Sequence, residues 1–341
     1  MILSELGWDG FFQSQPREGI PGRIALSSRE CFLVWTELGE LEVRPSGRLR
    51  HSSSRWPAVG DWVLLRENGA VIDRVLKRKT VITRKEPGKQ PREQVLAANI
   101  DVLFILSGLD RDYNPRRIER YLVLAEDSGA RPVILLNKVD LASELSLNVE
   151  DIARETQRLS PPSPVLLLSA ASGQGLERLA RLLAQGETGA LVGSSGVGKS
   201  TIMNRLLGEE RQNTCAVRAD DHRGRHTTTR RELFAMPGGW LLIDMPGLRE
   251  IQLWAEEGTV CSSFGDVQQL AQFCRFRDCT HTTEPGCAVQ SHLDPERLSN
   301  YHKLQRELAH LARKSGGRLA HQERQRWKAI ERSMRRHPKR G

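Results

Sequence analysis

The fold of this chain is decided by one stretch, Gly193-Ser194-Ser195-Gly196-Val197-Gly198-Lys199-Ser200, which has the phosphate-loop pattern G-x-x-x-x-G-K-[ST]. It follows an apolar run at 190–192, as such a loop should follow a buried strand. Its glycines would let backbone N–H groups surround a polyphosphate, Lys199 would neutralise the outer phosphates, and Ser200 would bind Mg²⁺. Thr201 completes the predicted set, at the start of a helix that should stop at Gly208.

A second motif, Asn137-Lys138-Val139-Asp140, comes before this loop, whereas ordinary GTPases carry the two in the opposite order. It follows the apolar run 132–136, which reads as a buried parallel strand. Asp140 can accept hydrogen bonds from N1–H and N2–H₂ of guanine, which adenine cannot donate. Asn137, Lys138 and Asp140 are therefore predicted to select a guanine base.

A third element, Ser169-Ala170-Ala171, also follows an apolar run and fits the loop whose backbone N–H reads guanine O6. Ser169 and Ala170 are the predicted contacts. The rival reading, a P-loop kinase or ATPase, requires the Asn137 motif to be accidental.

The switch elements come after the phosphate loop. Asp244-Met245-Pro246-Gly247 ends an apolar strand, so Asp244 would hold Mg²⁺ through water and the Gly247 N–H would meet the γ-phosphate. Thr228, in the cluster 227–229, would close on the same metal. Leu248 stands where Ras-like enzymes keep a catalytic glutamine, so we predict His226 as the catalytic substitute beside Lys199 and Thr228, although a loop histidine is also a common surface residue.

Predicted strands at 102–106, 133–136, 165–168, 191–192, 233–235 and 241–243 alternate with helices over most of this region. The first helix is well marked, with Asn114 as its cap, Pro115 in its first turn and Gly129 as its stop. This pattern predicts a doubly wound α/β P-loop domain that the chain enters at its middle.

Farther along, Cys274, Cys279, His281 and Cys287 have the spacing C-x4-C-x-H-x5-C. Three thiolates and one imidazole fit a closed tetrahedral Zn²⁺ site, and four protein ligands leave no position open for catalysis. We therefore predict a structural zinc; reduced cysteines in a core are the alternative. The absence of a signal peptide or a long apolar stretch favours a cytoplasmic protein.

The first hundred residues contain short runs rich in β-branched and aromatic residues, at 23–35, 39–50 and 60–78, and the hairpin signal Asn68-Gly69. They predict a small β-barrel of the OB type. Residues 74–92 hold eight Lys/Arg against one acid, which suits an RNA-binding groove or merely a solvated face. Residues 86–91 read as a linker into the α/β domain.

The formal charge of +9 comes entirely from residues 313–341, which hold 11 Lys/Arg and 2 Glu. Such a tail is typical of a segment that binds RNA; binding to a membrane surface and a merely disordered tail are the alternatives. Before it, Leu298, Tyr301, Leu304, Leu308 and Leu311 repeat at helical spacing and predict an amphipathic helix. The predicted domains are 1–96 (β-barrel with linker), 97–250 (GTPase), 251–312 (helical, zinc-binding) and 313–341 (tail).

Together the motif order, the His-Thr-Thr-Thr cluster, the Asp-x-Pro-Gly element and the cysteine spacing resemble the bacterial ribosome small-subunit-dependent GTPase family. The resemblance implies a multidomain fold: an OB-fold barrel, a circularly permuted GTPase domain and a mainly helical zinc-binding domain. It implies a cytoplasmic GTP hydrolase that converts GTP to GDP, binds the small (30S) ribosomal subunit, contacts its 16S rRNA through the OB-like and zinc domains, and acts late in subunit maturation. We further expect a monomer with no membrane partner. Met245 departs from the threonine usual at its position, and the basic tail lies outside the family pattern.

The alternative function is a GTP-switched RNA-binding or translation-factor-like protein without significant turnover of its own. Leu248 suggests it, because the usual catalytic glutamine is missing.

Overall fold

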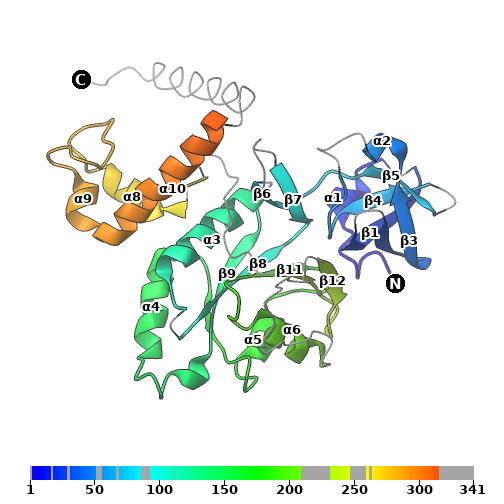
Figure 1. Cartoon of the computed structure of the whole chain (residues 1–341), viewed down its shortest axis with the longest axis horizontal. Helices are drawn as coiled ribbons and strands as arrows, with labels where there is room; N and C mark the ends of the chain where they lie inside the picture. Colours follow the sequence, from blue (N-terminus) through cyan, green and yellow to red (C-terminus); the bar gives the residue numbers. More distant parts are fainter. Residues whose placement is uncertain are drawn as a thin grey trace, which may run out of the picture. The chain divides into compact units, whose positions relative to one another are not determined.

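The computed structural model describes residues 2–16, 18–28, 31–50, 56–66, 69–85, 93–110, 112–208, 231–245, 259–260 and 263–314. The chain divides into two compact units (Figure 1): Met1–Thr83 with Val95–Ile251, and Arg84–Gln94 with Gln252–Gly341. The first unit contains the barrel and the α/β part, and the second contains the cysteine cluster.

The barrel of the first unit is built from five strands and a short helix. They are β1 (Ile20–Ser27), β2 (Phe32–Thr36), β3 (Gly39–Pro45), α2 (Gly47–Arg50), β4 (Trp62–Leu65) and β5 (Val71–Val75), preceded by α1 (Gly10–Gln13). The strands pair in the order β1-β2-β3-β5-β4, and β4 pairs back onto β1, which closes the barrel. The pairing of β3 with β5 is parallel. This closed five-stranded arrangement is the predicted OB-type barrel.

Apolar side chains from consecutive residues as well as alternate ones fill this barrel, and all four residues of β4 are buried. Trp62, Phe32 and Ile24 are all at most 1% exposed. The predicted hairpin turn connects β4 to β5, and Gly69 adopts φ +69° while its N–H donates to Arg66 O at 2.7 Å. The run predicted as β at 39–50 is corrected at its end: it is a strand only to Pro45 and then becomes α2, because the chain turns to reach β4.

A two-stranded ribbon, β6 (Val81–Lys85) with β7 (Glu93–Ala98), follows the barrel. The segment predicted as a linker, 86–91, lies outside the described residues, but the strands on its two sides pair with each other. The sequence missed this pairing because basic residues and prolines mask the strand pattern there.

The α/β part carries the predicted strands. They are β8 (Val102–Gly108), β9 (Arg131–Asn137), β10 (Val165–Leu167), β11 (Thr188–Val192), β12 (Glu232–Ala235) and β13 (Leu241–Asp244). They are ordered β10-β9-β8-β11-β13-β12, parallel except for β12, which runs antiparallel to β13. Because β8, β9 and β10 precede β11 in the chain, the sheet is entered at its middle, as predicted.

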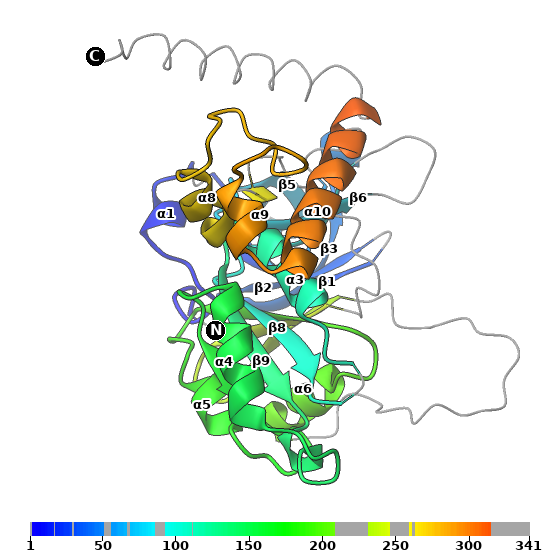
Figure 2. The same cartoon turned by 90° about the vertical axis from the view of Figure 1, so that its left-hand side faces the viewer.

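Helices cover both faces of this sheet. α3 (Pro115–Ser128) and α4 (Val149–Leu159) lie together, while α5 (Leu176–Ala180) and α6 (Lys199–Leu207) pack against the other face (Figures 1 and 2). The predicted ends of α3 are confirmed. The Asn114 side chain accepts a hydrogen bond from Arg117 N at 3.1 Å, and Gly129 ends the helix with φ +79°. α6 likewise ends at Gly208, at φ +71°.

The barrel and the α/β sheet share one continuous hydrogen-bonded sheet, because β1 pairs with β12. Arg23 of β1 is 1% exposed and donates to Asn99 O (3.0 Å), Thr188 Oγ1 (2.7 Å), Leu6 O and Gly60 O. Burial lowers the pKa of this guanidinium to about 10, against the Asp101 and Asp61 carboxylates. Thr188 begins β11, so the buried arginine ties the barrel to the strand that carries the phosphate loop.

The described core of the second unit is helical, with α8 (Gly265–Ala271), α9 (Ala288–His292) and α10 (Pro295–Lys314). The predicted apolar stripe lies on α10, where Tyr301, Leu304, Leu308 and Leu311 are buried. In the parts of the chain that the structure describes, no helix combines the length and apolarity that crossing a membrane requires.

Candidate nucleotide and metal sites

The phosphate loop connects β11 to α6. Gly198 adopts φ +105°, and a Cβ there would lie 2.3 Å from Asn137 Nδ2, so only glycine fits this close approach. Val197 is fully buried, while Ser195 and Gly196 are exposed at the loop surface. The loop therefore rests on the core through Val197 and presents its backbone outward.

Asn137 holds the three nucleotide elements together. Its Nδ2 donates to Val197 O in the phosphate loop at 2.7 Å, and its Oδ1 accepts from Ala170 N at 2.9 Å. The side chain is 1% exposed, so these hydrogen bonds are made away from water. Residues far apart in the chain are thus brought into one place by a single amide.

Lys199 is 9% exposed and donates through Nζ to Gly193 O at 2.8 Å and to Ser194 O at 2.6 Å. Burial lowers the pKa of this amine to about 8, against the opposing effect of the Asp244 and Asp112 carboxylates. The ammonium therefore lies over the loop, bonded to backbone carbonyls that a polyphosphate could replace.

Asp140 lies in a short 3₁₀ turn, Val139–Leu141, directly after Lys138, and is exposed. Lys138 itself has a left-handed backbone, at φ +69°. The Ala170 N–H is donated to Asn137, so a guanine reached through Ala170 would have to share or replace that bond. Ser169 is fully buried and its hydroxyl accepts from Ser172 N at 3.1 Å, which shapes the loop.

Of the residues predicted to bind Mg²⁺, the structure describes Ser200 and Asp244 but not Thr228. Ser200 and Thr201 lie in the first turn of α6, and Asp244 ends β13 beside β11, paired in register with Leu191. Met245 is 1% exposed, so the residue that departs from the family pattern packs in the core. His226, Thr228, Gly247 and Leu248 lie outside the described residues.

The cysteine cluster has the geometry of a metal site. The ligand atoms of Cys274, Cys279, His281 and Cys287 all lie within 4.8 Å of one another. Cys274 Sγ lies 3.9 Å from Cys287 Sγ, and His281 Nδ1 lies 3.6 Å and 3.4 Å from these two sulfurs.

A tetrahedral Zn²⁺ would separate two ligand sulfurs by about 3.8 Å and a sulfur from a nitrogen by about 3.5 Å. The three distances among Cys274, His281 and Cys287 fit these values. Burial lowers the pKa of His281, and the charge of the nearby His302 lowers it further. Both effects favour the neutral imidazole, which is the form that binds metals. Cys287 also caps α9, accepting from Gln290 N at 3.4 Å.

The basic run at 74–92 is partly used inside the protein. Arg78 forms a bidentate ion pair with the buried Asp61, at 2.7 Å, and Lys79 pairs with Asp9. Burial raises the pKa of Asp61, against the hydrogen bonds and charge of Arg78. These two basic residues therefore stabilise the first unit rather than lie free for a polyanion.

Two residues that the sequence reasoning missed lie beside the nucleotide elements. Asp110 accepts from Lys138 Nζ at 2.6 Å, and Asp112 accepts from the Ser194 hydroxyl. Their position in the sequence could have identified them, because they come directly after the parallel strand β8, and residues at the carboxyl ends of such strands surround the ligand in α/β sheets.

Comparison with known proteins agrees with this arrangement. The sequence model of the family described as RsgA GTPase matches residues 75–254. The chain is 46% identical to the small ribosomal subunit biogenesis GTPase RsgA of Opitutus terrae, over 98% of this chain and 97% of the relative. It is 40% identical to RsgA 1 of Listeria innocua, over 99% of both chains.

Solved structures show the same architecture. The crystal structure of YjeQ from Thermotoga maritima superposes with a TM-score of 0.62 at 27% identity, covering 85% of this chain and 98% of that one. The structure of YloQ, a circularly permuted GTPase, superposes with a TM-score of 0.59 at 22% identity, covering 85% and 95%. The second match supports the fold alone.

Proposed function

The chain belongs to the RsgA GTPase family, and from this membership we propose that it hydrolyses GTP in the biogenesis of the small (30S) ribosomal subunit. The proposal includes association with that subunit and its 16S rRNA, in the cytoplasm and as a monomer. The structural observation that supports this proposal best is a hydrogen bond: Asn137 of the base motif donates to Val197 O of the phosphate loop, although the two motifs occur in reversed order along the chain.

The nucleotide would bind across the carboxyl edge of β9, β8 and β11. Asp140 is exposed and would accept from guanine N1–H and N2–H₂, and Lys138 would cover the base. Lys199 would exchange the Gly193 and Ser194 carbonyls for phosphate oxygens, and the N–H groups of 193–201 would surround the same phosphates.

Mg²⁺ fits the hydroxyl and carboxylate donors here, because Ser200 and Asp244 come from neighbouring elements and offer the oxygen ligands it prefers. When bound, it would neutralise charge on the phosphates. In the GTP-bound state, Thr228 would bind the same Mg²⁺ and the Gly247 N–H would donate to the γ-phosphate. With Leu248 in place of glutamine, His226 would orient the attacking water.

The second unit would hold one structural Zn²⁺ through Cys274, Cys279, His281 and Cys287. A closed four-ligand site rigidifies a small domain rather than supplying chemistry. Contacts to rRNA would come from the OB-type barrel and this domain, with the basic run and the tail 313–341 as candidate contacts.

Multiple-turnover phosphate release tests this function. The isolated protein should hydrolyse GTP slowly, small subunits should accelerate the reaction, and large subunits should not. His226→Ala should remove most of the stimulation while GDP binding is retained. The alternative, a GTP-switched RNA-binding protein, predicts nucleotide-dependent binding to small subunits and no acceleration.

A further inference from the structure

The loop that follows β8 occupies a special place in this permuted sheet. β8 lies between β9, which leads to the base motif, and β11, which leads to the phosphate loop. All three strands are parallel, so their carboxyl ends lie at the same edge. Residues just after Gly108 therefore lie between the two halves of the nucleotide site.

Asp110 reaches the base motif from this loop. Its Oδ2 accepts from Lys138 Nζ at 2.6 Å, and both side chains are 26% exposed. A Cβ on Gly108 would lie 2.8 Å from Asp110 Oδ1 and 3.5 Å from Lys138 Cδ, so the glycine leaves room for the pair. Partial burial opposes ionisation of Asp110, but the hydrogen bonds from Lys138 and Asp112 N outweigh it and lower its pKa.

Asp112 reaches the phosphate loop from the same loop. Its Oδ2 accepts from the Ser194 hydroxyl, and its Oδ1 accepts from Arg117 Nη1 at 2.7 Å. Arg117 lies in the first turn of α3 and also donates to Asp112 O at 3.3 Å. The carboxylate is therefore held by Ser194 through one oxygen and by Arg117 through the other.

The described residues of this loop are held by hydrogen bonds to one another and to neighbouring helices. Asp112 N donates to Asp110 Oδ1 at 2.9 Å, so the two carboxylates are linked. The Tyr113 hydroxyl lies 2.9 Å from Thr156 Oγ1 of α4, and Asn114 caps α3. A loop fixed at both ends can transmit position from one contact to the other.

We infer that Asp110 and Asp112 are positioning residues that fix the base motif and the phosphate loop at one separation, through Lys138 and Ser194 respectively. The inference rests on the proposed function, because a guanine nucleotide is the ligand that spans both halves. Asp110 holds the Lys138 amine while the lysine stem covers the base, and its ion pair supports the left-handed backbone there. Asp112 accepts a hydrogen bond from Ser194, so the backbone carbonyls and N–H groups of the phosphate loop are already positioned before the nucleotide binds.

The test is a double-mutant cycle on GDP binding to the full-length protein. Asp112→Ala and Ser194→Ala should each weaken GDP binding by about ten- to a hundred-fold, as expected for loss of a hydrogen bond to a charged group. The double variant should be no weaker than the weaker single variant, since both changes remove one bond. Asp110→Ala and Lys138→Ala should behave in the same way, and dissociation of GDP should be faster in all of them.

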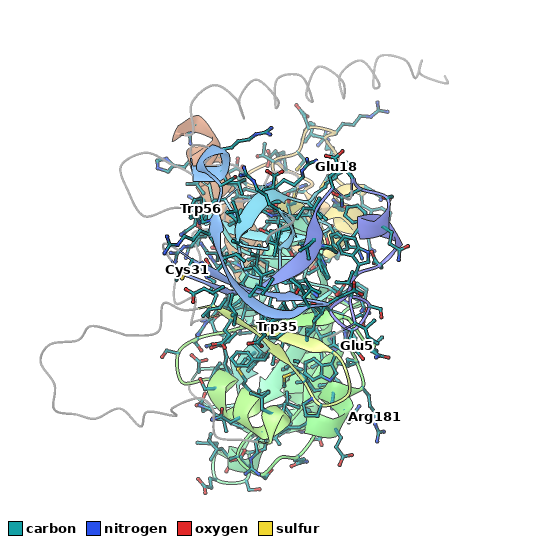
Figure 3. All side chains as sticks on the ribbon, turned by 90° about the vertical axis from the view of Figure 1, so that its right-hand side faces the viewer. Glu5, Glu18, Cys31, Trp35, Trp56 and Arg181 are labelled. Carbon is teal, nitrogen blue, oxygen red and sulfur yellow. The ribbon has the colours of Figure 1, made fainter. Side chains whose placement is uncertain are left out.

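Arg181→Ala serves as the matched control, because this arginine points outward from the end of α5 and its side chain is 80% exposed (Figure 3). Its GDP affinity should equal that of the wild type, and circular dichroism should show every variant folded. Asp112→Asn, which keeps an acceptor oxygen, should bind GDP better than Asp112→Ala.

Two results would overturn the inference. One is tighter GDP binding in Asp112→Ala with no effect of Ser194→Ala, which would make Asp112 a repulsive charge rather than a positioning residue. The other is additive losses in both cycles. A wild type that binds ADP as well as GDP would instead contradict the proposed function, whatever the cycles give.

Discussion

Nucleotide affinity should depend on pH through Lys199. The amine of the free protein has its pKa lowered to about 8 by burial, with Asp244 and Asp112 opposing the shift. Polyphosphate favours the ammonium form, so bound nucleotide should raise this pKa again. Below the free-state pKa the lysine is already charged and binding adds no proton; above it, binding must add one.

The magnitude follows from the fraction of lysine that is charged. With a free-state pKa of about 8, this fraction is about nine-tenths at pH 7, one-half at pH 8 and one-eleventh at pH 9. The dissociation constant of GDP should therefore rise about two-fold by pH 8 and about ten-fold by pH 9. Titration calorimetry in two buffers of different ionisation enthalpy should show uptake of about half a proton at pH 8.

Ionisation of the guanine N1–H at alkaline pH could imitate part of this loss. Proton uptake at pH 8 separates the two effects, because the guanine N1–H is almost entirely protonated at that pH and contributes almost no uptake. A dissociation constant that stays flat from pH 7 to pH 9, with no proton uptake at pH 8, would refute the argument.

Two further predictions concern the scaffold. Arg23→Met removes the guanidinium donor from Leu6 O, Asn99 O and Thr188 Oγ1, whereas Gly60 O keeps its hydrogen bond from Asn99 Nδ2. The change should therefore destabilise the first unit by about 3–5 kcal/mol, measured by denaturant unfolding, and Arg181→Met at an exposed site should have no comparable effect. Purified protein should contain one Zn²⁺ per chain by elemental analysis, and Cys287→Ala should remove it, lower the thermal stability of the second unit and leave GDP binding intact; metal-free protein of normal stability would contradict the assignment.

Local patterns predicted those parts of the fold that depend on neighbouring residues. The phosphate loop, the Asn114 cap and the Gly69 turn each follow from the conformational needs of a few adjacent residues, and the structure has each of them. The buried strands of the sheet were equally visible, because parallel strands covered on both faces are continuously apolar.

Long-range contacts could not be predicted in this way. Nothing near Asn137 in the sequence indicates that its amide joins Val197 O to Ala170 N, and nothing near Arg23 indicates its burial against Thr188. The pairing of β6 with β7 was hidden for a different reason, since the basic residues and prolines in and between these strands mask the local strand pattern.

The central claim is that two motifs in reversed chain order form one guanine site, and a change of base preference tests it most directly. Asp140→Asn should weaken GDP binding by about ten- to a hundred-fold, because the amide cannot accept from both N1–H and N2–H₂. The same variant should bind xanthosine diphosphate more tightly than the wild type does, since xanthine carries an oxygen where guanine has its 2-amino group. Measured by competition against labelled GDP and xanthosine diphosphate, a reversed preference is the predicted result, and an unchanged preference would contradict the account.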